Sequence, residues 1–281
     1  MKTPFLESVN DFSVSHEKFS LEWNQQQDML ITVPQPSSDT LSSYYQSEDY
    51  ISHTDHARTL IEKLYQFVKR YTLKQKAKLL VNNNIRGTVL DVGAGTGDFL
   101  NVINQFGFQG IGFEPGEKPR NKAIEKGIHL IDDLQVIEKD SVDAITLWHV
   151  LEHIPDYEDQ LKVFQAILKP GGFLIIAVPN FKSFDAQHYK QYWAAYDVPR
   201  HLWHFSEPSI KRLARENGLM WESTKPMWFD SFYVSMLSEK YQSGSGNVIK
   251  AFFVGLFSNI KALFSSEYSS KIYLLKKPEL Q

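Results

Sequence analysis

Two carboxylates and three glycines stand close together near residue 95 of the 281-residue chain, in the run Asp91-Val92-Gly93-Ala94-Gly95-Thr96-Gly97 and at Glu114. Residues 88–92 predict a buried strand and residues 98–106 a helix, so the glycines form the turn between them. Glycine lets a backbone turn sharply and approach a ligand closely, and the N–H groups of a helix start face that turn. Glu114 ends the next predicted strand, where it would accept hydrogen bonds from two ribose hydroxyls. The pattern therefore predicts a nucleoside site.

The glycine spacing separates two classes of nucleoside ligand. Dinucleotide-binding proteins carry G-x-G-x-x-G, whereas this chain has G-x-G-x-G with Asp98 in the place of the third glycine. An acid at a helix start suits a cationic ligand better than a pyrophosphate, and Asp91 would lie near an ammonium group. The spacing thus disfavours an NAD-dependent oxidoreductase, which we keep as an alternative.

Five segments in chain order resemble the motifs of class I S-adenosylmethionine-dependent methyltransferases. They are VLDVGAGTGDFL (89–100), GIGFEP (110–115), GIHLIDDL (127–134), DAITLWHVLEHIPD (143–156) and LKPGGFLIIAVPN (168–180). The resemblance covers about residues 85–180 and includes similarity to quinol O-methyltransferases. It implies an α/β fold with a Rossmann-like, doubly wound, mostly parallel seven-stranded sheet and helices on both faces, as the alternating strands and helices also indicate.

The same resemblance implies S-adenosyl-L-methionine as methyl donor and S-adenosyl-L-homocysteine as product. Glu114 would bind the ribose, and Asp132 or Asp133 would approach the adenine. Trp148 and His149 would face the donor from the carboxyl edge of the sheet. The full set of expected donor-binding residues is Asp91, Gly93, Ala94, Gly95, Gly97, Glu114, Pro115, Asp132, Asp133, Trp148 and His149.

The segment from His149 to His153 reads H-x-x-E-H, a string that also occurs in a class of zinc peptidases. There both histidines share one face of a helix, but here the segment follows a strand and Ile154-Pro155 limits any helix. The matching stretch of quinol O-methyltransferases is E-x-x-E-H and is linked to a divalent ion; His149 replaces the first acid. We predict no metal ligand, and we expect His153 either to contact the substrate or to fix the turn through a backbone carbonyl.

A second polar segment, Asp197-Val198-Pro199-Arg200-His201, follows an aromatic stretch after the fifth predicted strand. Loops there open at the sheet edge where ligands of α/β folds bind. Arg200 is a candidate for holding an acidic group of the substrate, and His201 is a candidate general base. An Arg200–Asp197 ion pair with packed histidines is the alternative, and a His201–His204 metal pair is a weaker one. The predicted catalytic residues are therefore His153, Arg200 and His201.

The remainder divides into a predicted N-terminal extension, 1–54, and a methyltransferase domain, 55–281, with a helical insertion at about 228–266. Residues 12–14, 19–23 and 29–33 predict short strands. Relatives of similar sequence carry a zinc ribbon there, for which this chain lacks every cysteine. Three tyrosines, Tyr44, Tyr45 and Tyr50, are candidates for a lid. The apolar helix predicted at 247–264 would be a cap helix buried on the domain or in a dimer. The alternative is a helix at a membrane interface or one wall of a pocket for a lipid-like substrate.

Composition limits the partners. The net charge is −3 and there is no cysteine, which disfavours nucleic-acid binding and excludes disulfides and thiolate sites. We therefore predict a cytoplasmic enzyme, monomeric or homodimeric, without stable membrane insertion although peripheral contact is open. It would methylate oxygen or nitrogen of a small-molecule acceptor such as a sugar, quinol, lipid or related metabolite. A non-catalytic nucleoside-binding subunit or sensor is the alternative.

Overall fold

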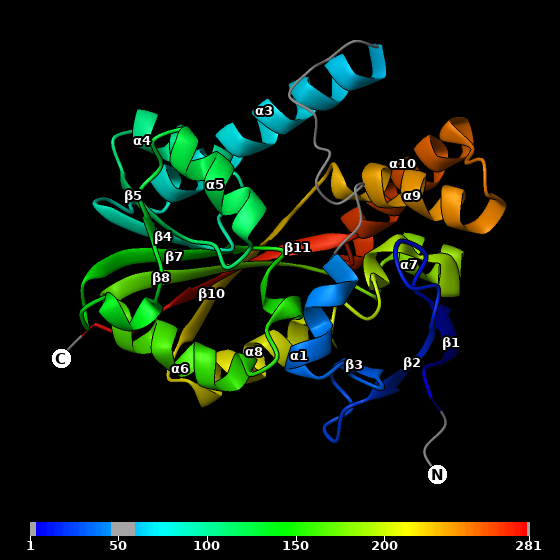
Figure 1. The fold of residues 1–281 in the computed structure, drawn as a ribbon, viewed down its shortest axis with the longest axis horizontal. Helices are drawn as coiled ribbons and strands as arrows, with labels where there is room; N and C mark the ends of the chain where they lie inside the picture. Colours follow the sequence, from blue (N-terminus) through cyan, green and yellow to red (C-terminus); the bar gives the residue numbers. More distant parts are fainter. Residues whose placement is uncertain (1–3, 46–59, 280–281) are drawn as a thin grey trace.

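The predicted doubly wound sheet is confirmed by the computed structural model, which describes residues 4–45 and 60–279 (Figure 1). Seven strands pair in the order β10-β11-β8-β7-β4-β5-β6. Their bounds are β4 Thr88–Val92, β5 Gln109–Phe113, β6 Leu130–Ile131, β7 Val142–Trp148, β8 Leu168–Pro179, β10 Met220–Pro226 and β11 Ser270–Lys276. β11 pairs antiparallel with both β8 and β10, so it alone runs against the other six strands.

Helices cover both faces of this sheet (Figure 1). Apolar residues of α3 (Leu60–Asn82), α4 (Asp98–Gln105) and α5 (Glu117–Glu125) pack in one core on one face. Those of α6 (Tyr157–Ile167) and α8 (Glu207–Glu216) pack in another core on the opposite face. α8 begins as its sequence predicts, because Ser206 and Ser209 form a capping box with Pro208 in the first turn. The two cores fix the sheet edge at which β4, β5 and β7 end.

A second, four-stranded antiparallel sheet joins the N-terminal region to the domain. Its order is β1-β2-β3-β9, with bounds Leu6–Asn10, Lys18–Trp23, Leu30–Val33 and Trp203–His204. Strands were predicted near β2 and β3, but the predicted strand at 12–14 is wrong. Asp11 accepts hydrogen bonds from the backbone N–H groups of Ser13 and Ser15 at 3.0 and 2.7 Å, which closes a turn in place of a strand.

The start of β8 also differs from the prediction. The sequence predicts a helix over residues 156–168 that is ended by the Lys-Pro-Gly-Gly segment at 169–172, yet α6 ends at Ile167 and β8 starts at Leu168. The reason is pairing with the chain after β11: Gly171 N donates to Lys277 O at 2.9 Å, and Lys277 N donates to Gly172 O at 2.8 Å. A glycine pair that looks like a loop is therefore held in extended form by a distant segment.

The remaining helices surround the carboxyl edge of the sheet. α1 (Ser38–Leu41) lies in the N-terminal region, α7 (Phe184–Tyr189) follows β8, and α9 (Asp230–Ser243) and α10 (Val248–Ser265) form a pair beside α7 (Figure 1). Short 3-10 helices η1 (Ser42–Tyr45), η2 (Leu134–Val136), η3 (Leu151–His153), η4 (Lys190–Tyr192) and η5 (Ala194–Tyr196) complete the fold. Among described residues, α10 is the one helix whose length and apolar composition would suffice to cross a membrane.

Candidate functional site

The glycine turn after β4 has the shape of a ligand cradle. Gly93 has a φ of +70°, and a Cβ there would meet the Val150 side chain at 2.4 Å. Gly95 has a φ of +54°, and no described atom lies within 4 Å of where its Cβ would be. Both positions favour glycine by conformation, but they differ in surroundings. Gly93 packs against the chain itself, whereas Gly95 borders open space into which a ligand can reach.

Glu114 closes the other side of this turn. β4 and β5 pair in register up to Val92 and Phe113, so the residue after β5 emerges beside the glycines. The Glu114 carboxylate is buried and accepts hydrogen bonds from Gly95 N at 2.8 Å and Gly116 N at 2.7 Å. A carboxylate has about four acceptor sites, so two more are left for hydroxyl groups. Glu114 thus lies beside the glycine turn, as expected from the sequence, and its contact with a ribose stays a prediction.

Asp91 lies beneath the turn at the end of β4. It is buried, and Thr146 Oγ1 donates to its Oδ1 at 2.6 Å. Burial raises the pKa of Asp91 to about 7 in spite of that hydrogen bond. A carboxylate in this state gains most from a nearby cation, because a positive charge restores the stability that burial removes.

Lys76 of α3 faces the same space and was missed by sequence reasoning. Burial lowers the pKa of Lys76 to about 8, although the negative charges of Asp230 and Asp91 act to raise that pKa. Its Nζ lies 4.3 Å from the ring centroid of Trp148, and the Trp148 Nε1 atom is buried without a hydrogen-bond partner in the described part of the chain. Lys76 and Trp148 thus offer an ammonium and an N–H donor to a ligand. In the sequence, Lys76 is one of several lysines on an amphipathic helix, so nothing distinguished it.

The two acids predicted near the adenine end of the site are turned toward the chain's own groups. Asp132 forms an ion pair with Arg120 and is exposed. Asp133 caps η2 by accepting a hydrogen bond from Gln135 N at 2.9 Å. Both residues lie just after β6, as expected, and their contact with adenine stays a prediction. Pro115 is exposed beside Glu114, and Ala94 packs into the core under the turn.

His149 is held between two acids rather than pointing freely toward the donor space. Its Nε2 lies 3.0 Å from Asp230 Oδ2, and its Nδ1 lies 3.4 Å from Glu152 Oε1. Burial alone would lower its pKa, but the two acids outweigh burial and raise that pKa to about 9. His149 is therefore an imidazolium that joins β7 to α9. The helical arrangement of the peptidase motif is absent here, because residues 151–153 form the 3-10 helix η3.

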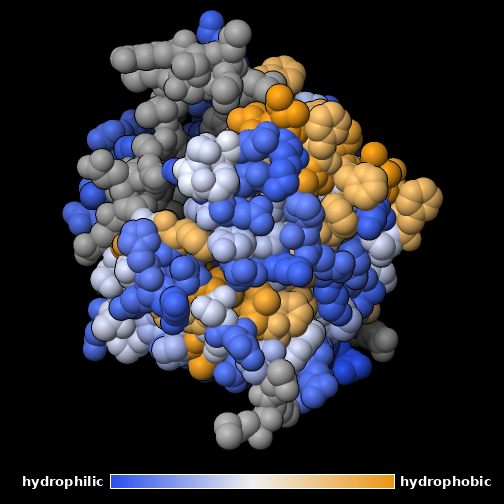
Figure 2. All heavy atoms as spheres, turned by 90° about the vertical axis from the view of Figure 1, so that its right-hand side faces the viewer, coloured by the Kyte–Doolittle hydropathy of each residue, from blue (hydrophilic) through white to orange (hydrophobic). Residues whose placement is uncertain are grey.

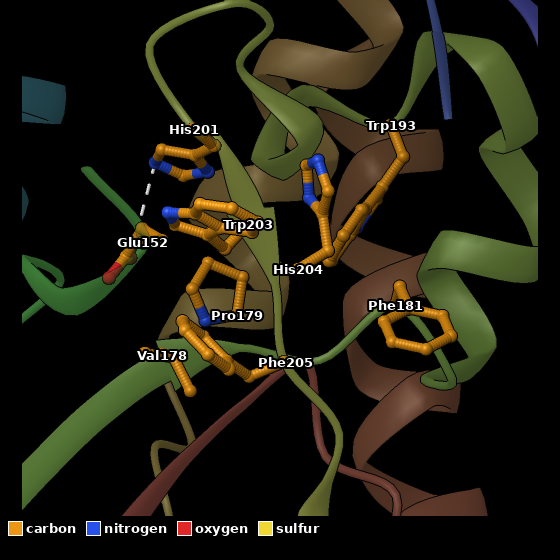
Figure 3. Close-up of a pocket in the computed structure, with 9 residues that line it drawn as sticks. All are labelled: Glu152, Val178, Pro179, Phe181, Trp193, His201, Trp203, His204 and Phe205. Atoms are coloured by element: carbon orange, nitrogen blue, oxygen red, sulfur yellow. Dashed lines mark ion pairs between the residues drawn. The ribbon is translucent and has the colours of Figure 1, made fainter. Parts of the chain in front are cut away.

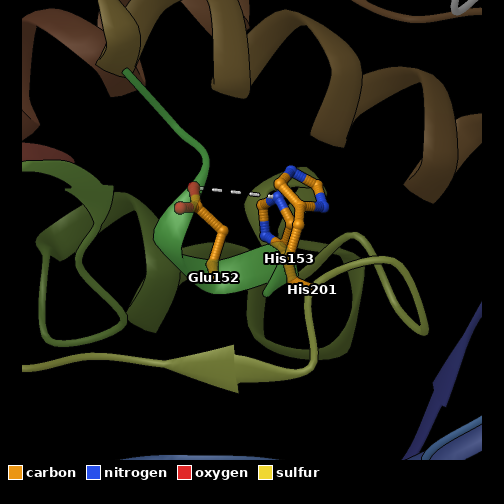
Figure 4. Close-up of side chains that lie close together, drawn as sticks. All are labelled: Glu152, His153 and His201. Atoms are coloured by element: carbon orange, nitrogen blue, oxygen red, sulfur yellow. Dashed lines mark ion pairs between the residues drawn. The ribbon is translucent and has the colours of Figure 1, made fainter. Parts of the chain in front are cut away.

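Glu152, His153 and His201 come together from two segments 48 residues apart (Figure 4). One ligand atom from each lies within 4.8 Å of the others. Glu152 is fully buried, and neither of its oxygens accepts a well-formed hydrogen bond from a described residue. Burial alone would raise the pKa of Glu152, but His149 and the other histidines hold it below its usual range. The cluster thus places one buried carboxylate between His149 and the two imidazoles of His153 and His201.

Backbone carbonyls orient both imidazoles of the cluster. His201 Nδ1 lies 2.9 Å from Ala195 O, and His153 Nδ1 lies 3.0 Å from Arg200 O and 3.0 Å from the Tyr45 hydroxyl. A carbonyl only accepts, so Nδ1 of each ring is the hydrogen-bond donor in these contacts. The Nε2 atom of His201 lies 4.0 Å from Glu152 Oε1. The turn-fixing contact of His153 that we weighed from the sequence is present, and burial lowers its pKa to about 4.

Arg200 lies behind this cluster. Its guanidinium is 2% exposed and donates to Asp197 at 2.7 Å, to Asp11 at 3.0 Å, to Ser13 Oγ and to the Tyr44 carbonyl at 2.9 Å. The ion pair with Asp197 is thus present, and the chain's own groups also take up the other donors. Arg200 fastens the N-terminal region to the loop after β8; a role in holding an acceptor stays a prediction. Of the three tyrosines proposed for a lid, Tyr50 lies outside the described residues.

An aromatic pocket lies next to the cluster (Figure 3). Its lining residues come from η3, β8, the loop after β8 and the segment around β9: Glu152, Val178, Pro179, Phe181, Trp193, His201, Trp203, His204 and Phe205. His204 Nε2 lies 3.0 Å from Thr32 Oγ1 of β3, so the N-terminal sheet also supports the pocket. The His204 ring therefore contacts Thr32 rather than His201. Among the described residues, the side chains close enough to share a metal ion are Glu152, His153 and His201, and His204 is not one of them.

Residues 56–224, more than half of the chain, match a family model described as a methyltransferase domain. The chain belongs to this methyltransferase family. The match spans α3, the glycine turn, Glu114, the histidine cluster and α8, so the cradle described above lies wholly within the family's domain.

Two similar proteins are ubiquinone biosynthesis O-methyltransferases. That of Coxiella burnetii is 31% identical over 117 residues, 38% of this chain and 50% of the relative. That of Bordetella avium is 29% identical over 147 residues, 47% of this chain and 61% of the relative. The similarity thus spans about half to three fifths of these relatives.

Solved methyltransferase structures share the fold. The 1,6-didemethyltoxoflavin-N1-methyltransferase of Burkholderia thailandensis superposes with a TM-score of 0.52 and 14% identity, covering 92% of this chain and 99% of that one. A SAM-dependent methyltransferase of Archaeoglobus fulgidus gives 0.50 and 16%, covering 76% and 99%. At these identities, the comparison establishes the class I methyltransferase fold alone.

Proposed function

We propose that this protein transfers the methyl group of S-adenosyl-L-methionine to oxygen or nitrogen of a small-molecule acceptor. The observation that carries the proposal is the pair of buried carboxylates, Asp91 and Glu114, on two sides of a glycine turn whose middle glycine borders open space. Two acids favour a ligand with a positive charge and ribose hydroxyls, and they oppose a diphosphate.

Each part of the cradle has a distinct role in this proposal. Glu114 would accept both ribose hydroxyls through the acceptor sites that Gly95 and Gly116 leave open. Asp91 would face the donor's ammonium group, and Lys76 would face its carboxylate from α3. The Trp148 indole would donate its unpartnered Nε1–H. These contacts fix the donor and direct its reacting end toward the edge of the sheet where β7 and β8 end.

When bound, S-adenosyl-L-methionine supplies an electrophilic methyl group on a positively charged sulfur. The chain must align the acceptor with it, and alignment supplies much of the rate in such reactions. His201 is the proposed base: its Nδ1–H is held by Ala195 O, so its Nε2 can accept the proton that the acceptor's hydroxyl or amine loses. Glu152, 4.0 Å away, would stabilise the resulting imidazolium. Arg200 would position His201 by fixing the loop.

The side chains around the aromatic pocket favour a flat or apolar acceptor. Trp193, Trp203 and Phe205 lie there together with the two polar groups Glu152 and His201, and rings with a few polar groups suit a planar ligand. Because these side chains are packed against one another with no space left between them, an acceptor ring would have to displace them. The ubiquinone biosynthesis enzymes to which the chain is similar support a ring-shaped acceptor. Within the wider set of sugars, quinols, lipids and related metabolites, we therefore place ring compounds first.

Two measurements test the proposal. Thermal shift assays with S-adenosylmethionine, S-adenosylhomocysteine and NAD should show stabilisation by the first two and none by NAD, and Glu114→Ala or Asp91→Ala should abolish that shift. Turnover of methyl-labelled donor against a panel of small metabolites should yield a labelled product. Binding without turnover on any acceptor would favour the non-catalytic subunit or sensor, and stabilisation by NAD alone would refute the donor site.

A further inference from the structure

The helix α10 buries and exposes the opposite kinds of residue from an ordinary surface helix. The residues that it buries are small or polar: Ala251, Val254, Gly255, Ser258, Asn259 and Ala262. The residues that it exposes are mostly large and apolar: Val248, Ile249, Phe252, Phe253, Leu256, Phe257, Ile260, Leu263 and Phe264. A helix on a water-soluble domain normally buries its apolar stripe. Burial of α10 on its own domain, one of the alternatives drawn from the sequence, therefore does not hold for the large side chains, and their surroundings need another explanation.

α9 follows the same pattern and packs closely against α10. It buries Ser231, Val234, Ser235, Ser238 and Glu239 and exposes Tyr233 and Met236. A Cβ at Gly255 would meet the Phe232 backbone at 2.9 Å, so the two helices approach as closely as glycine allows. Small residues at the contact with large apolar residues outside are typical of helices packed in a lipid environment.

The inner face of this helix pair is fastened to the domain by polar contacts. Ser258 Oγ donates to Asp185 Oδ1 at 2.6 Å, and Asn259 Nδ2 donates to Trp228 O at 2.8 Å. Asp185 also accepts hydrogen bonds from Trp193 Nε1 and Ser269 Oγ, both at 2.7 Å. These contacts tie α10 to the loop that lines the aromatic pocket. Lipid therefore cannot surround α10, and only its outer face is available to a partner.

The outer face is extensive and carries charge of one sign. Exposure reaches 89% for Phe264, 73% for Ile249 and 61% for Phe253, and Figure 2 shows large hydrophobic side chains gathered along one side of this face of the molecule. From residue 240 to residue 266 the charged residues are Lys240, Lys250 and Lys261. Lys250 forms an ion pair with the buried Glu239 at 2.8 Å, so Lys240 and Lys261 supply the net positive charge of this face. All three lysines are exposed. Apolar side chains flanked by lysines match the boundary between acyl chains and anionic headgroups.

We propose that the α9–α10 face, defined as the exposed residues of α9 and α10, docks this protein onto an anionic lipid bilayer. α10 lies in the interfacial plane, about 27 Å long for its 18 residues, with its phenylalanines among the upper acyl chains. A second copy of the chain is a poorer fit, because protein interfaces carry roughly one hydrogen bond per 100–200 Å². Between Ile249 and Phe264, the exposed side chains offer only Lys250 and Lys261 as donors. The proposal concerns location and is independent of methyl transfer.

Vesicle flotation tests the proposal with the full chain. We expect the protein to float with vesicles of phosphatidylcholine and phosphatidylglycerol at 7:3, and to float less with pure phosphatidylcholine. The double variant Phe253→Glu/Phe264→Glu should lose at least tenfold in the partition coefficient. The matched control is Ile124→Glu/Val136→Glu, which charges two apolar residues that are 53% and 67% exposed on the opposite part of the domain; it should float like the wild type.

A second pair of variants tests the charge. Lys240→Gln/Lys261→Gln should reduce partition to the anionic vesicles by about fivefold per lysine and leave partition to phosphatidylcholine nearly unchanged. Circular dichroism and the thermal shift with S-adenosylhomocysteine should match the wild type for every variant, which separates loss of docking from misfolding. Equal flotation of the two glutamate variants would overturn the proposal. So would absence of flotation combined with a concentration-dependent dimer that Phe253→Glu/Phe264→Glu dissociates.

Discussion

The donor side of the site and the proposed acceptor side are built in different ways. The donor cradle comes chiefly from one stretch of 24 residues, Asp91 to Glu114, in which two neighbouring parallel strands end side by side. The acceptor side joins four separate segments: Asp11 to Ser15, Tyr44 and Tyr45, Glu152 and His153, and residues 197–204. A site formed within one short stretch should tolerate substitutions elsewhere in the chain. A site formed from four separate segments should depend on the contacts that hold each segment in place.

Because of this difference, we expect donor binding and acceptor positioning to respond separately to substitutions. On the donor side, polar groups such as Glu114 and Trp148 keep unfilled hydrogen-bonding capacity. On the proposed acceptor side, the chain takes up most of the donors of Arg200, and the carbonyls of Ala195 and Arg200 orient the two imidazoles. Glu152 is the buried group there that keeps unfilled acceptor sites. Damage to the donor side should therefore weaken ligand binding in a folded protein. Damage to the acceptor side should change turnover or loop order while donor binding persists.

The largest expected effect comes from His201→Ala. If His201 is the base, its loss should lower kcat by about 10²- to 10⁴-fold, the usual contribution of general base catalysis. Because His201 does not contact the glycine turn, the thermal shift with S-adenosylhomocysteine should be retained. Stopped assays with labelled donor and dye-monitored melting measure the two quantities. Loss of the thermal shift in His201→Ala would show that His201 is needed for donor binding and would contradict separate roles for the two sides.

Next in size is Arg200→Met, which removes a buried cation and leaves Asp11 and Asp197 without their partner. Breaking a buried ion pair costs about 3–5 kcal/mol of stability, so the midpoint of urea unfolding should fall markedly. Limited proteolysis should then release the N-terminal region, because Arg200 joins that region to the loop. The matched control Arg215→Met alters an arginine near the end of α8 for which no ion pair is recorded among the described residues, and it should leave both readouts unchanged.

Gly95→Ala tests whether Gly95 borders the bound donor. Gly95 and Gly218 have similar φ values, +54° and +66°, and neither has a described atom within 4 Å of its ideal Cβ. Alanine at either position costs about 1–2 kcal/mol of backbone strain. Only the methyl at Gly95 would also enter the donor space, so the Kd for S-adenosylhomocysteine should rise by about tenfold more than in Gly218→Ala. Equal Kd values for the two variants would show that Gly95 does not border the ligand.

The smallest expected effect is a pH dependence of donor binding. Because burial raises the pKa of Asp91 to about 7, the ionised fraction rises from roughly one tenth at pH 6 to about three quarters at pH 7.5. The ammonium group of the donor needs the ionised form, so affinity should increase by about eightfold over this range. Asp91→Asn should bind weakly and show a flat profile. Tighter binding at pH 6 than at pH 7.5 in the wild type would contradict the role of Asp91.

The sequence predicted most of the sheet because the information there is local. Hydrophobic strands, the glycine turn and Glu114 lie within a few residues of one another, and parallel pairing places their ends at one edge. Prediction failed where hydrogen bonds with residues distant in the sequence determine the local structure. Asp11 closes a turn where a strand was expected at 12–14, and Lys277 holds residues 171–172 extended.

The acceptor side was only partly visible for the same reason. His153, His201 and Arg200 were recognisable as polar residues at the correct edge. Their actual partners, Asp11, Tyr45 and Ala195, lie in segments whose approach depends on the second sheet. Lys76 gave no signal, because a lysine on an amphipathic helix looks the same whether it faces solvent or Asp91. The reversed burial of α10 could not be predicted either, because which face it turns inward depends on contacts with distant residues such as Asp185 and Trp228.

Isothermal titration calorimetry of ligand-free protein at pH 7.5 tests the central claim most directly. We predict saturable heat with S-adenosylhomocysteine, loss of that heat in Glu114→Ala, and no heat with NAD. Saturation by NAD with no heat from S-adenosylhomocysteine would contradict a cradle in which Asp91 and Glu114 select a cationic nucleoside donor.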